Sequence, residues 1–379
     1  MDVYDSALEL HKKYQGKLEV RSLVPLTGRS ELSLSYSPGV AAVSRLIAED
    51  KTTAYTHTLK GRTIAVISDG SAILGLGNLG PEAALPVMEG KCALFKEFAG
   101  VDAFPLCLDT QDTEEIIKTV KYLAPNFGGI NLEDISAPRC FEIEARLKAE
   151  LDIPVMHDDQ HGTATVVLAG LINALKLKNI DKQEVRIIVN GAGAAGSAVT
   201  NMLINYGFTK IIVVDRDGAI YSGRPGISLE KEQLAEKTNP EKKSGNLAEV
   251  IIGADVFIGV SSPGVLFPEM IATMNPQPVI FALANPVPEI MPTEALAAGA
   301  YIVATGRSDF PNQINNVLAF PGIFRGALDN GVKQITQEML IRAADNLASL
   351  VENPRPDFIL PDPFDKRVPV AIAQAISVI

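Results

Sequence analysis

Residues 185–215 read VRIIVNGAGAAGSAVTNMLINYGFTKIIVVD, and this stretch decides the fold. An apolar run at 185–190 leads directly into a motif of the form G-x-G-x-x-G, made of Gly191, Ala192, Gly193, Ala194, Ala195 and Gly196. A helical pattern follows, and a second apolar run then ends at Asp215. In such a unit the helix N-terminus binds the pyrophosphate of a dinucleotide, and the acid binds a ribose. The stretch therefore predicts a Rossmann unit.

The residues that end the second strand bear on the choice of coenzyme. Asp215 can accept hydrogen bonds from both ribose hydroxyls, and its charge would repel the 2′-phosphate of NADP. Arg216 has the opposite effect, because a guanidinium can bind that phosphate bidentately. We expect a preference for NAD, with NADP as the alternative.

Short apolar runs alternate with helical patterns on both sides of this stretch, which is typical of parallel sheets covered by helices. The strands that we expect are 63–68, 103–108, 128–132, 153–156, 185–190, 210–215, 255–260, 278–283 and 301–306. We expect an α/β protein with an N-terminal substrate and metal domain over residues 1–160. A Rossmann-type, doubly wound parallel sheet should occupy residues 161–379, with the junction near residue 160.

A second match to the glycine pattern lies at residues 75–80, GLGNLG. Pro81 follows it at once, and Asp109, after the next strand, lies too far along the chain to serve as the ribose acid. We therefore expect a turn that lets the backbone approach a ligand or another element, and we assign no dinucleotide to it.

The overall composition excludes several classes of function. The formal net charge is −11 and Lys and Arg form no block, which argues against nucleic acid or an anionic membrane surface as partner. The chain lacks the ~20-residue apolar run of a membrane span and the apolar core of a signal peptide. Cys92, Cys107 and Cys140 fit reduced core thiols, so we expect a soluble, cytoplasmic protein.

Two pairs of acids stand where buried strands end. Glu133 and Asp134 follow the run GGINL, and Asp158 and Asp159 follow IPVMH. Ligands of open α/β sheets bind beyond the carboxyl ends of strands, and oxygen ligands favour Mg²⁺ or Mn²⁺ over Zn²⁺. The acids are equally suited to cap the following helices, and the residues alone leave both interpretations open.

A zinc site is the rival interpretation of the same segment. His157 and His161 have the i, i+4 spacing of the H-E-x-x-H motif, which requires a helix. A strand precedes His157, and we expect a turn at Gly162 and Thr163 before the next helix, so we reject this site.

Tyr36 precedes a Ser-Pro-Gly turn, and Lys91 interrupts an apolar helical pattern. Taken alone, such a tyrosine is usually packed and such a lysine usually reaches solvent. Longer blocks around them are more specific: SYSPGVA, DGSAILGLGNLGPEAALPVMEGK, GGINLEDISAP, HDDQHGTA, NGAGAAG and TGRSDFPNQINNVLAFPGIFRGAL. Together they resemble the short bacterial malic enzymes, from the first helix to near residue 368.

The resemblance implies a metal- and nicotinamide-dependent oxidative decarboxylation of malate to pyruvate. It implies no phosphate acetyltransferase-like domain, and a homodimer or higher even oligomer in which Tyr36 could complete the partner's site. Its implied catalytic residues are Tyr36 as general acid, Lys91 as general base and Asp158 beside the lysine. Its implied metal ligands are Glu133, Asp134 and Asp159. The implied nicotinamide or substrate contacts are Asn285, Asn315 and Asn316.

One position departs from the family pattern. Longer relatives carry an arginine that pairs with a substrate carboxylate where this chain has Ala72. We expect Lys60 or Arg62 to supply the charge. We also expect burial and the nearby metal to lower the pKa of Lys91, which would suit a base.

Two other functions were weighed. A non-decarboxylating hydroxy-acid or amino-acid dehydrogenase would have no use for the four strand-end acids, and metal-independent turnover would favour it. A nicotinamide-sensing regulator would leave Lys91 and Tyr36 idle, and an inactive protein that still binds dinucleotide would favour it.

Overall fold

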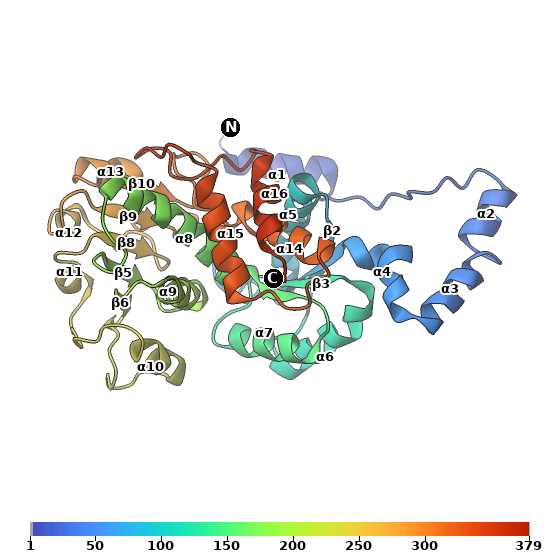
Figure 1. Ribbon diagram of the computed structural model, residues 1–379, viewed down its shortest axis with the longest axis horizontal. Helices are drawn as coiled ribbons and strands as arrows, with labels where there is room; N and C mark the ends of the chain where they lie inside the picture. Colours follow the sequence, from blue (N-terminus) through green and yellow to red (C-terminus); the bar gives the residue numbers. More distant parts are fainter. Residues whose placement is uncertain (1–2, 379) are drawn as a thin grey trace.

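The computed structural model describes residues 3–378 and contains two parallel-stranded sheets (Figure 1). The first sheet has the order β2-β1-β3-β4 and is parallel throughout. Its strands are β1 (Thr63–Ser68), β2 (Asp102–Cys107), β3 (Gly129–Leu132) and β4 (Val155–His157).

Both faces of the first sheet are buried, which explains its near-continuous apolar runs. On one face, Ile64 and Val66 share a core with α5 (Pro81–Ala99). On the other, Ala65 and Ile67 share a core with α6 (Thr113–Leu123) and α7 (Arg139–Glu150). The carboxyl ends of these strands therefore form one edge between two helical layers.

The second sheet has the order β10-β9-β8-β5-β6-β7, with β5 at the point where the strand order reverses. Its parallel strands are β5 (Arg186–Asn190), β6 (Lys210–Asp215), β8 (Val256–Gly259), β9 (Val279–Ala282) and β10 (Ile302–Thr305). The short β7 (Gly218–Ala219), which the sequence did not predict, pairs antiparallel with β6. Its associated helices are α9 (Ala194–Tyr206), α10 (Leu229–Ala235), α11 (Leu247–Val250), α12 (Pro268–Ile271) and α13 (Pro292–Ala297). The α/β fold and its strands are as predicted, to within a few residues at each end.

The long helix α8 (Asp158–Lys178) begins at the residue after β4 and leads to the second sheet. The turn predicted at Gly162 and Thr163 is therefore wrong. Gly162 lies inside the helix, where a Cβ would meet the Asp158 carboxylate oxygen at 1.8 Å. The glycine makes room for a buried acid rather than for a turn.

Three C-terminal helices return over the rest of the molecule: α14 (Phe320–Asp329), α15 (Gln337–Ser349) and α16 (Arg367–Ala375). The Phe95 ring on α5 meets the rings of Phe320 and Phe324 on α14 edge-on, at 4.7 and 5.5 Å between centroids. Helix α14 therefore packs on the helix that carries Lys91, a contact that the sequence did not predict.

The first part of the chain forms α1 (Val3–Tyr14), α2 (Arg29–Ser35), α3 (Val40–Glu49) and α4 (Ala54–His57). In Figure 1 α1 lies at the top of the body, and residues 18–49, which include α2 and α3, form an arm. None of these helices has a buried residue. Figure 1 shows α2 and α3 at the right, well away from both sheets. Exposed apolar side chains on this arm include Leu23, Leu26, Leu32, Leu34 and Val40.

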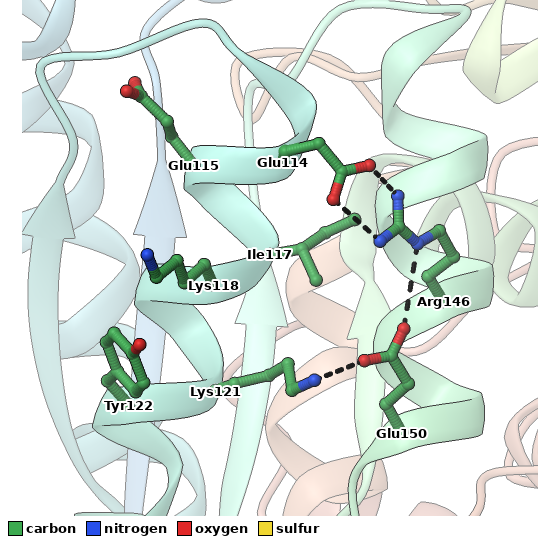
Figure 2. Close-up of a pocket in the computed structure, with 8 residues that line it drawn as sticks. All are labelled: Glu114, Glu115, Ile117, Lys118, Lys121, Tyr122, Arg146 and Glu150. Carbon is green, nitrogen blue, oxygen red and sulfur yellow. Dashed lines mark hydrogen bonds and ion pairs between the residues drawn. The ribbon is translucent and has the colours of Figure 1, made fainter.

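A charged groove runs between α6 and α7 on the outside of the first sheet (Figure 2). Arg146 pairs there with Glu114 and Glu150, and Lys121 also pairs with Glu150. Exposed pairs of this kind contribute little to stability. The charged pairs of this groove join α6 to α7, and we assign no chemistry to it.

Within residues 3–378, no helix has both the length and the apolar character that crossing a membrane requires.

Candidate active site

Three carboxylates converge at the carboxyl edge of the first sheet. Glu133 and Asp134 follow β3, Asp159 lies in the first turn of α8 after β4, and these strands are neighbours. One ligand atom from each lies within 4.8 Å of the other two. The Asp134 backbone N–H also donates to Asp159 Oδ2 at 2.9 Å. Parallel pairing thus brings together two acid pairs that are separated along the chain.

Asp134 is held in an unusual backbone conformation, with φ at +53°. The Ala72 N–H donates to the Asp134 carbonyl at 3.0 Å and ties the loop after β3 to the loop after β1. Aspartate is one of the few residues that tolerate this left-handed region. The conformation fixes the position of one carboxylate of the acid cluster.

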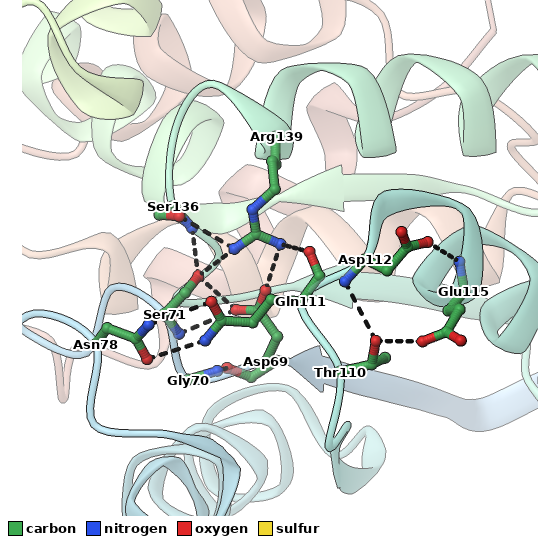
Figure 3. A network of polar contacts seen from close by, with 11 residues as sticks. Asp69, Gly70, Ser71, Asn78, Thr110, Gln111, Asp112, Glu115, Ser136 and Arg139 are labelled. Atoms are coloured by element: carbon green, nitrogen blue, oxygen red, sulfur yellow. Dashed lines mark hydrogen bonds and ion pairs between the residues drawn. The ribbon is translucent and has the colours of Figure 1, made fainter.

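A polar network around Arg139 also fixes the same two loops (Figure 3). Arg139 donates to Asp69 Oδ2 at 2.8 Å and to Ser71 Oγ at 2.9 Å. The Ser136 N–H donates to Ser71 Oγ at 2.9 Å. This clamp was not predicted from the sequence, because its members come from different loops.

Lys91 projects from α5 into the carboxylates and is only 7 % exposed. Its Nζ lies 2.6 Å from Asp158 Oδ2 and 2.8 Å from Glu133 Oε1. Asn316 Oδ1 accepts from the same nitrogen at 3.5 Å, and the Phe320 ring covers it at 4.3 Å. The predicted neighbours Lys91 and Asp158 are therefore in direct contact.

The expected lowering of the Lys91 pKa is not found. Burial by itself lowers the pKa of this ammonium, but the charges of Asp158 and Glu133 outweigh burial and raise it. Desolvation and a nearby metal, on which the expectation rested, are opposed here by direct ion pairs of Lys91 with two buried acids.

The four acids of the site are costly to ionise where they lie, because they are buried and close to one another. Burial and the charges of Asp159 and Glu133 raise the pKa of Asp134 to about 9. Burial also raises the pKa values of Glu133, Asp158 and Asp159. Asp134 Oδ2 and Asp158 Oδ1 are buried without a hydrogen-bond partner. A hard divalent cation fits such an all-oxygen set, because it would both coordinate and neutralise the oxygens.

The two histidines do not form a zinc site with each other. His157 ends β4, whereas His161 lies on α8 and its Nε2 is 3.0 Å from the Glu144 carboxylate. Glu144 also accepts from the His157 backbone N–H at 2.9 Å. Glu144, which sequence reasoning missed, thus holds the β4–α8 turn from which Asp158 and Asp159 project.

The glycine motif lies where β5 separates β6 from β8. A Cβ at Gly196 would lie 1.8 Å from the Gly191 carbonyl oxygen, and one at Gly191 would meet the Val260 carbonyl at 2.5 Å. Nothing lies within 4 Å of a Cβ at Gly193. Two glycines therefore allow close packing of β5, α9 and the loop after β8, and the third faces open space.

The loops after β9 and β10 carry the three asparagines. A Cβ at Gly75 would lie 2.3 Å from the Asn285 carbonyl oxygen, so residues 75–80 do form a close-approach turn, as expected. Asn315 Nδ2 donates to the Gly306 carbonyl at 3.3 Å, and its Oδ1 accepts from the Val317 N–H. Among the three, Asn316 is the one whose side chain contacts Lys91.

Asp215 ends β6, but both of its oxygens are occupied. Arg224 donates to them at 2.8 and 2.6 Å, and Lys231 Nζ lies 2.6 Å from Oδ2. Arg216, by contrast, is 91 % exposed at its side chain and lies 3.8 Å from Asp217. The partners of Asp215 are therefore two cations further along the chain, which the sequence did not predict, and not the adjacent arginine.

Three predicted residues lie away from these groups. Tyr36 ends α2 on the arm and is 70 % exposed. Lys60 donates to the carbonyls of Ala124, Pro125 and Phe127, and Arg62 pairs with Asp102 at 3.5 Å. Both cations precede β1, at the amino end of the sheet. Their expected role with a substrate carboxylate is therefore wrong.

Comparisons with known proteins agree over the whole chain. The family description "Malic enzyme, N-terminal domain" matches residues 15–148, and "Malic enzyme, NAD binding domain" matches residues 160–379. The chain is 56 % identical to the bifunctional malic/malolactic enzyme of Bacillus subtilis, covering 100 % of this chain and 93 % of that protein. It is 55 % identical to the NAD-dependent malic enzyme of Geobacillus stearothermophilus, covering 95 % and 76 %.

Solved structures give the same result. The NAD-dependent malic enzyme of Thermotoga maritima superposes with a TM-score of 0.95 at 51 % identity, covering 98 % of each chain. The malic enzyme of Entamoeba histolytica gives 0.96 at 40 % identity, covering 99 % of this chain and 80 % of that one.

The acid cluster should destabilise the protein when no metal is bound. The Asp134 pKa of about 9 lies above the value near ~3.9 of an unfolded aspartate, so stability falls as the pH rises from one to the other. We expect Asp134→Asn to stabilise the chelator-treated protein by roughly 1–3 kcal/mol at pH ~8. Asparagine also tolerates the left-handed backbone here.

Urea unfolding at pH ~4 and pH ~8 measures this effect, and Glu142→Gln, on the exposed face of α7, is the control. The Asp134→Asn variant should gain stability at the higher pH and little at the lower. A loss of stability at both values would contradict the interpretation.

Proposed function

This chain belongs to the malic enzyme family, and we propose a role in its reaction for the groups at the two sheet edges. The reaction is the oxidative decarboxylation of malate to pyruvate and CO₂ with reduction of a nicotinamide coenzyme. Family membership removes the sensing regulator and the non-decarboxylating dehydrogenase as alternatives. The observation that carries the proposal is the buried Lys91 ammonium. It lies between Asp158 and Glu133, and Glu133 also belongs to the three-acid cluster that could hold a metal ion.

Glu133, Asp134 and Asp159 would hold Mg²⁺ or Mn²⁺. The support is their close approach, their all-oxygen chemistry and the unpartnered oxygen of Asp134. When bound, the cation supplies Lewis-acid stabilisation of the charge that develops on the substrate C2 oxygen. Its charge would also offset the carboxylates that raise the Lys91 pKa.

Once a bound cation offsets the neighbouring carboxylates, Lys91 in its neutral amine form would accept the proton of the C2 hydroxyl. The nicotinamide coenzyme, when bound, would supply the acceptor for the C2 hydride. Asp158 is fully buried, and its Oδ2 lies 2.6 Å from Lys91 Nζ, so it would orient the amine. Asn316 joins the amine to the coenzyme side, because the neighbouring Asn315 contacts Gly306 and Gly306 lies against Asn285. This chain of contacts supports a position for the proposed base between the carboxylates proposed for the metal and the loops proposed for nicotinamide.

Tyr36 would protonate C3 after CO₂ is lost from C4. Its arm extends away from the sheets of its own chain and exposes a row of leucines. We propose a homodimer in which this arm packs on the partner, so that Tyr36 completes the partner's site. Burial of those side chains would supply the driving force, at ~25 cal/mol per Å².

NAD should be the preferred coenzyme. Asp215 engages both Arg224 and Lys231, so neither cation is free to meet a 2′-phosphate. Asp215 would therefore favour NAD by holding both cations away from a phosphate, and not through oxygens left open to the ribose hydroxyls. Arg216 remains a predicted phosphate ligand, although its side chain lies in solvent.

A cytoplasmic location suits the cysteines. Cys92, Cys107 and Cys140 form no disulfide, and burial raises the pKa of Cys107 to about 11 and that of Cys140 to about 12. Such thiols are unreactive and suit a reducing compartment.

The reaction and its metal dependence are tested in one assay. Malate, Mn²⁺ and each coenzyme are supplied, and reduced dinucleotide and pyruvate are followed together. We expect both products in equal amounts, and we expect excess chelator or Asp159→Ala to abolish them while dinucleotide still binds. Full activity in chelator would refute the metal assignment.

Mixed dimers test the role of Tyr36. We expect Tyr36→Phe and Lys91→Ala to be nearly inactive when expressed separately. Co-expressed chains should recover about a quarter of the unmodified activity, since half of the dimers are mixed and one of their two sites is intact. If Tyr36 acted in its own chain, each site would lack one residue and no activity would return.

The ratio of kcat/KM for NADP to that for NAD tests the coenzyme assignment. We expect a ratio below one, and we expect Asp215→Ser to raise it about tenfold or more because Arg224 and Lys231 are released. Arg216→Ala is the comparison variant and lowers the ratio if Arg216 binds the phosphate. A ratio above one in the unmodified enzyme would contradict the NAD preference.

A further inference from the structure

The site described so far lacks positive charge for its substrate. Malate carries two carboxylates, and the strand ends contribute Glu133, Asp134, Asp158 and Asp159 against the one ammonium of Lys91. Ala72 supplies no charge to this pocket. A divalent cation would not by itself balance four acids and a dianion. A further cationic side chain at this edge would reduce the repulsion between these acids and the substrate carboxylates.

Several cations are excluded by position or by partner. Lys60 and Arg62 lie at the opposite end of β1. Both terminal nitrogens of Arg139 already donate, to Asp69, Ser71, Ser136 and the Gln111 carbonyl, and Asp69 neutralises its charge.

Arg307 lies at the required edge. It follows Thr305 and Gly306 at the carboxyl end of β10, and its Nη1 donates to the Pro286 carbonyl at 3.2 Å. Gly306 lies against the Asn285 amide. The preceding carbonyl, that of Asn285, contacts the turn at Gly75. The guanidinium thus lies where the coenzyme-sheet loops meet the substrate-sheet loop that contains Ala72.

The present partner of Arg307 is easily exchanged. Nε and Nη2 donate to Asp309 at 2.8 and 2.6 Å, but the two side chains are 32 % and 56 % exposed. A solvent-exposed pair of residues two apart contributes little to stability. A substrate carboxylate presents the same fork to the guanidinium and could replace Asp309 at small cost.

We propose that Arg307 binds the C1 carboxylate of malate, an inference that rests on the proposed function. The C1 carboxylate keeps its charge from malate through to pyruvate, so a cation there stabilises every bound species. The C4 carboxylate loses its charge when it leaves as CO₂ and the C3–C4 bonding electrons stay with C3. A cation bound to C4 would stabilise the charged carboxylate and so oppose this step. Arg307 is thus a substrate-binding residue contributed by the coenzyme sheet.

Steady-state kinetics of Arg307→Gln test the proposal. The KM for malate should rise about 10- to 100-fold, as expected for the loss of a charge-assisted bond. The inhibition constant of pyruvate, which retains C1, should rise by a similar factor, and the KM for NAD should stay within about twofold. Arg367→Gln is the matched control, because Arg367 pairs with Asp365 two residues away in the same manner on α16. It should change none of these values.

Asp309→Asn separates binding from structure. If Asp309 competes with substrate for Arg307, the KM for malate should fall or stay constant in this variant. If the pair is structural, Asp309→Asn should raise it as Arg307→Gln does, and the proposal is overturned. An unchanged KM for malate and an unchanged inhibition constant of pyruvate in Arg307→Gln would also overturn the proposal. An unmodified enzyme that fails to oxidise malate would instead overturn the proposed function, and this inference with it.

Discussion

A buried ammonium among carboxylates is the constraint on which the rest of the site depends. Lys91 is nearly inaccessible, and ions in such surroundings are stable only when their partners are close and well oriented. Asp158 and Glu133 meet this condition because β3 and β4 are adjacent and α8 starts without an intervening loop. Asp134 and Asp159 are costly to ionise in this cluster, and a divalent cation would neutralise the charge that their ionised forms carry.

The two sheets are connected through this charge cluster. Phe320 of α14 covers the Lys91 ammonium, and Asn316, just before α14, reaches the same nitrogen. The loop after β9 lies against the glycine turn after β1, and the loop after β10 lies against the loop after β9. Oxidation needs the coenzyme and the base on one substrate, and this arrangement brings the two sheet edges to a common boundary. The proposed use of Arg307 follows the same logic, with a cation from one sheet serving a pocket of acids in the other.

The N-terminal arm stands apart from this arrangement. Its helices bury no side chain of their own, yet they carry Tyr36 and many exposed leucines. Exposed apolar surface of this extent usually marks an interface. If Tyr36 is the proton donor and the arm is a dimer interface, as we propose, decarboxylation depends on the dimer. The proposed base and the proposed metal ligands all come from one chain.

The sequence by itself determined the strands, the glycine motif and the acids at strand ends, because apolar periodicity and turn chemistry are local properties. The roles of Lys91 and Tyr36 came from resemblance, since an isolated lysine or tyrosine carries no such signal. Only the tertiary structure decided the surroundings of each charge. In the folded chain Asn316 contacts Lys91, 225 residues away in sequence. Asp215 pairs with Arg224 and Lys231 and not with Arg216. The tertiary structure also placed Lys60 and Arg62 at the wrong end of the sheet. Charges interact through space, and the distances that decide their partners and their pKa values exist only after the strands have paired and the helices have packed.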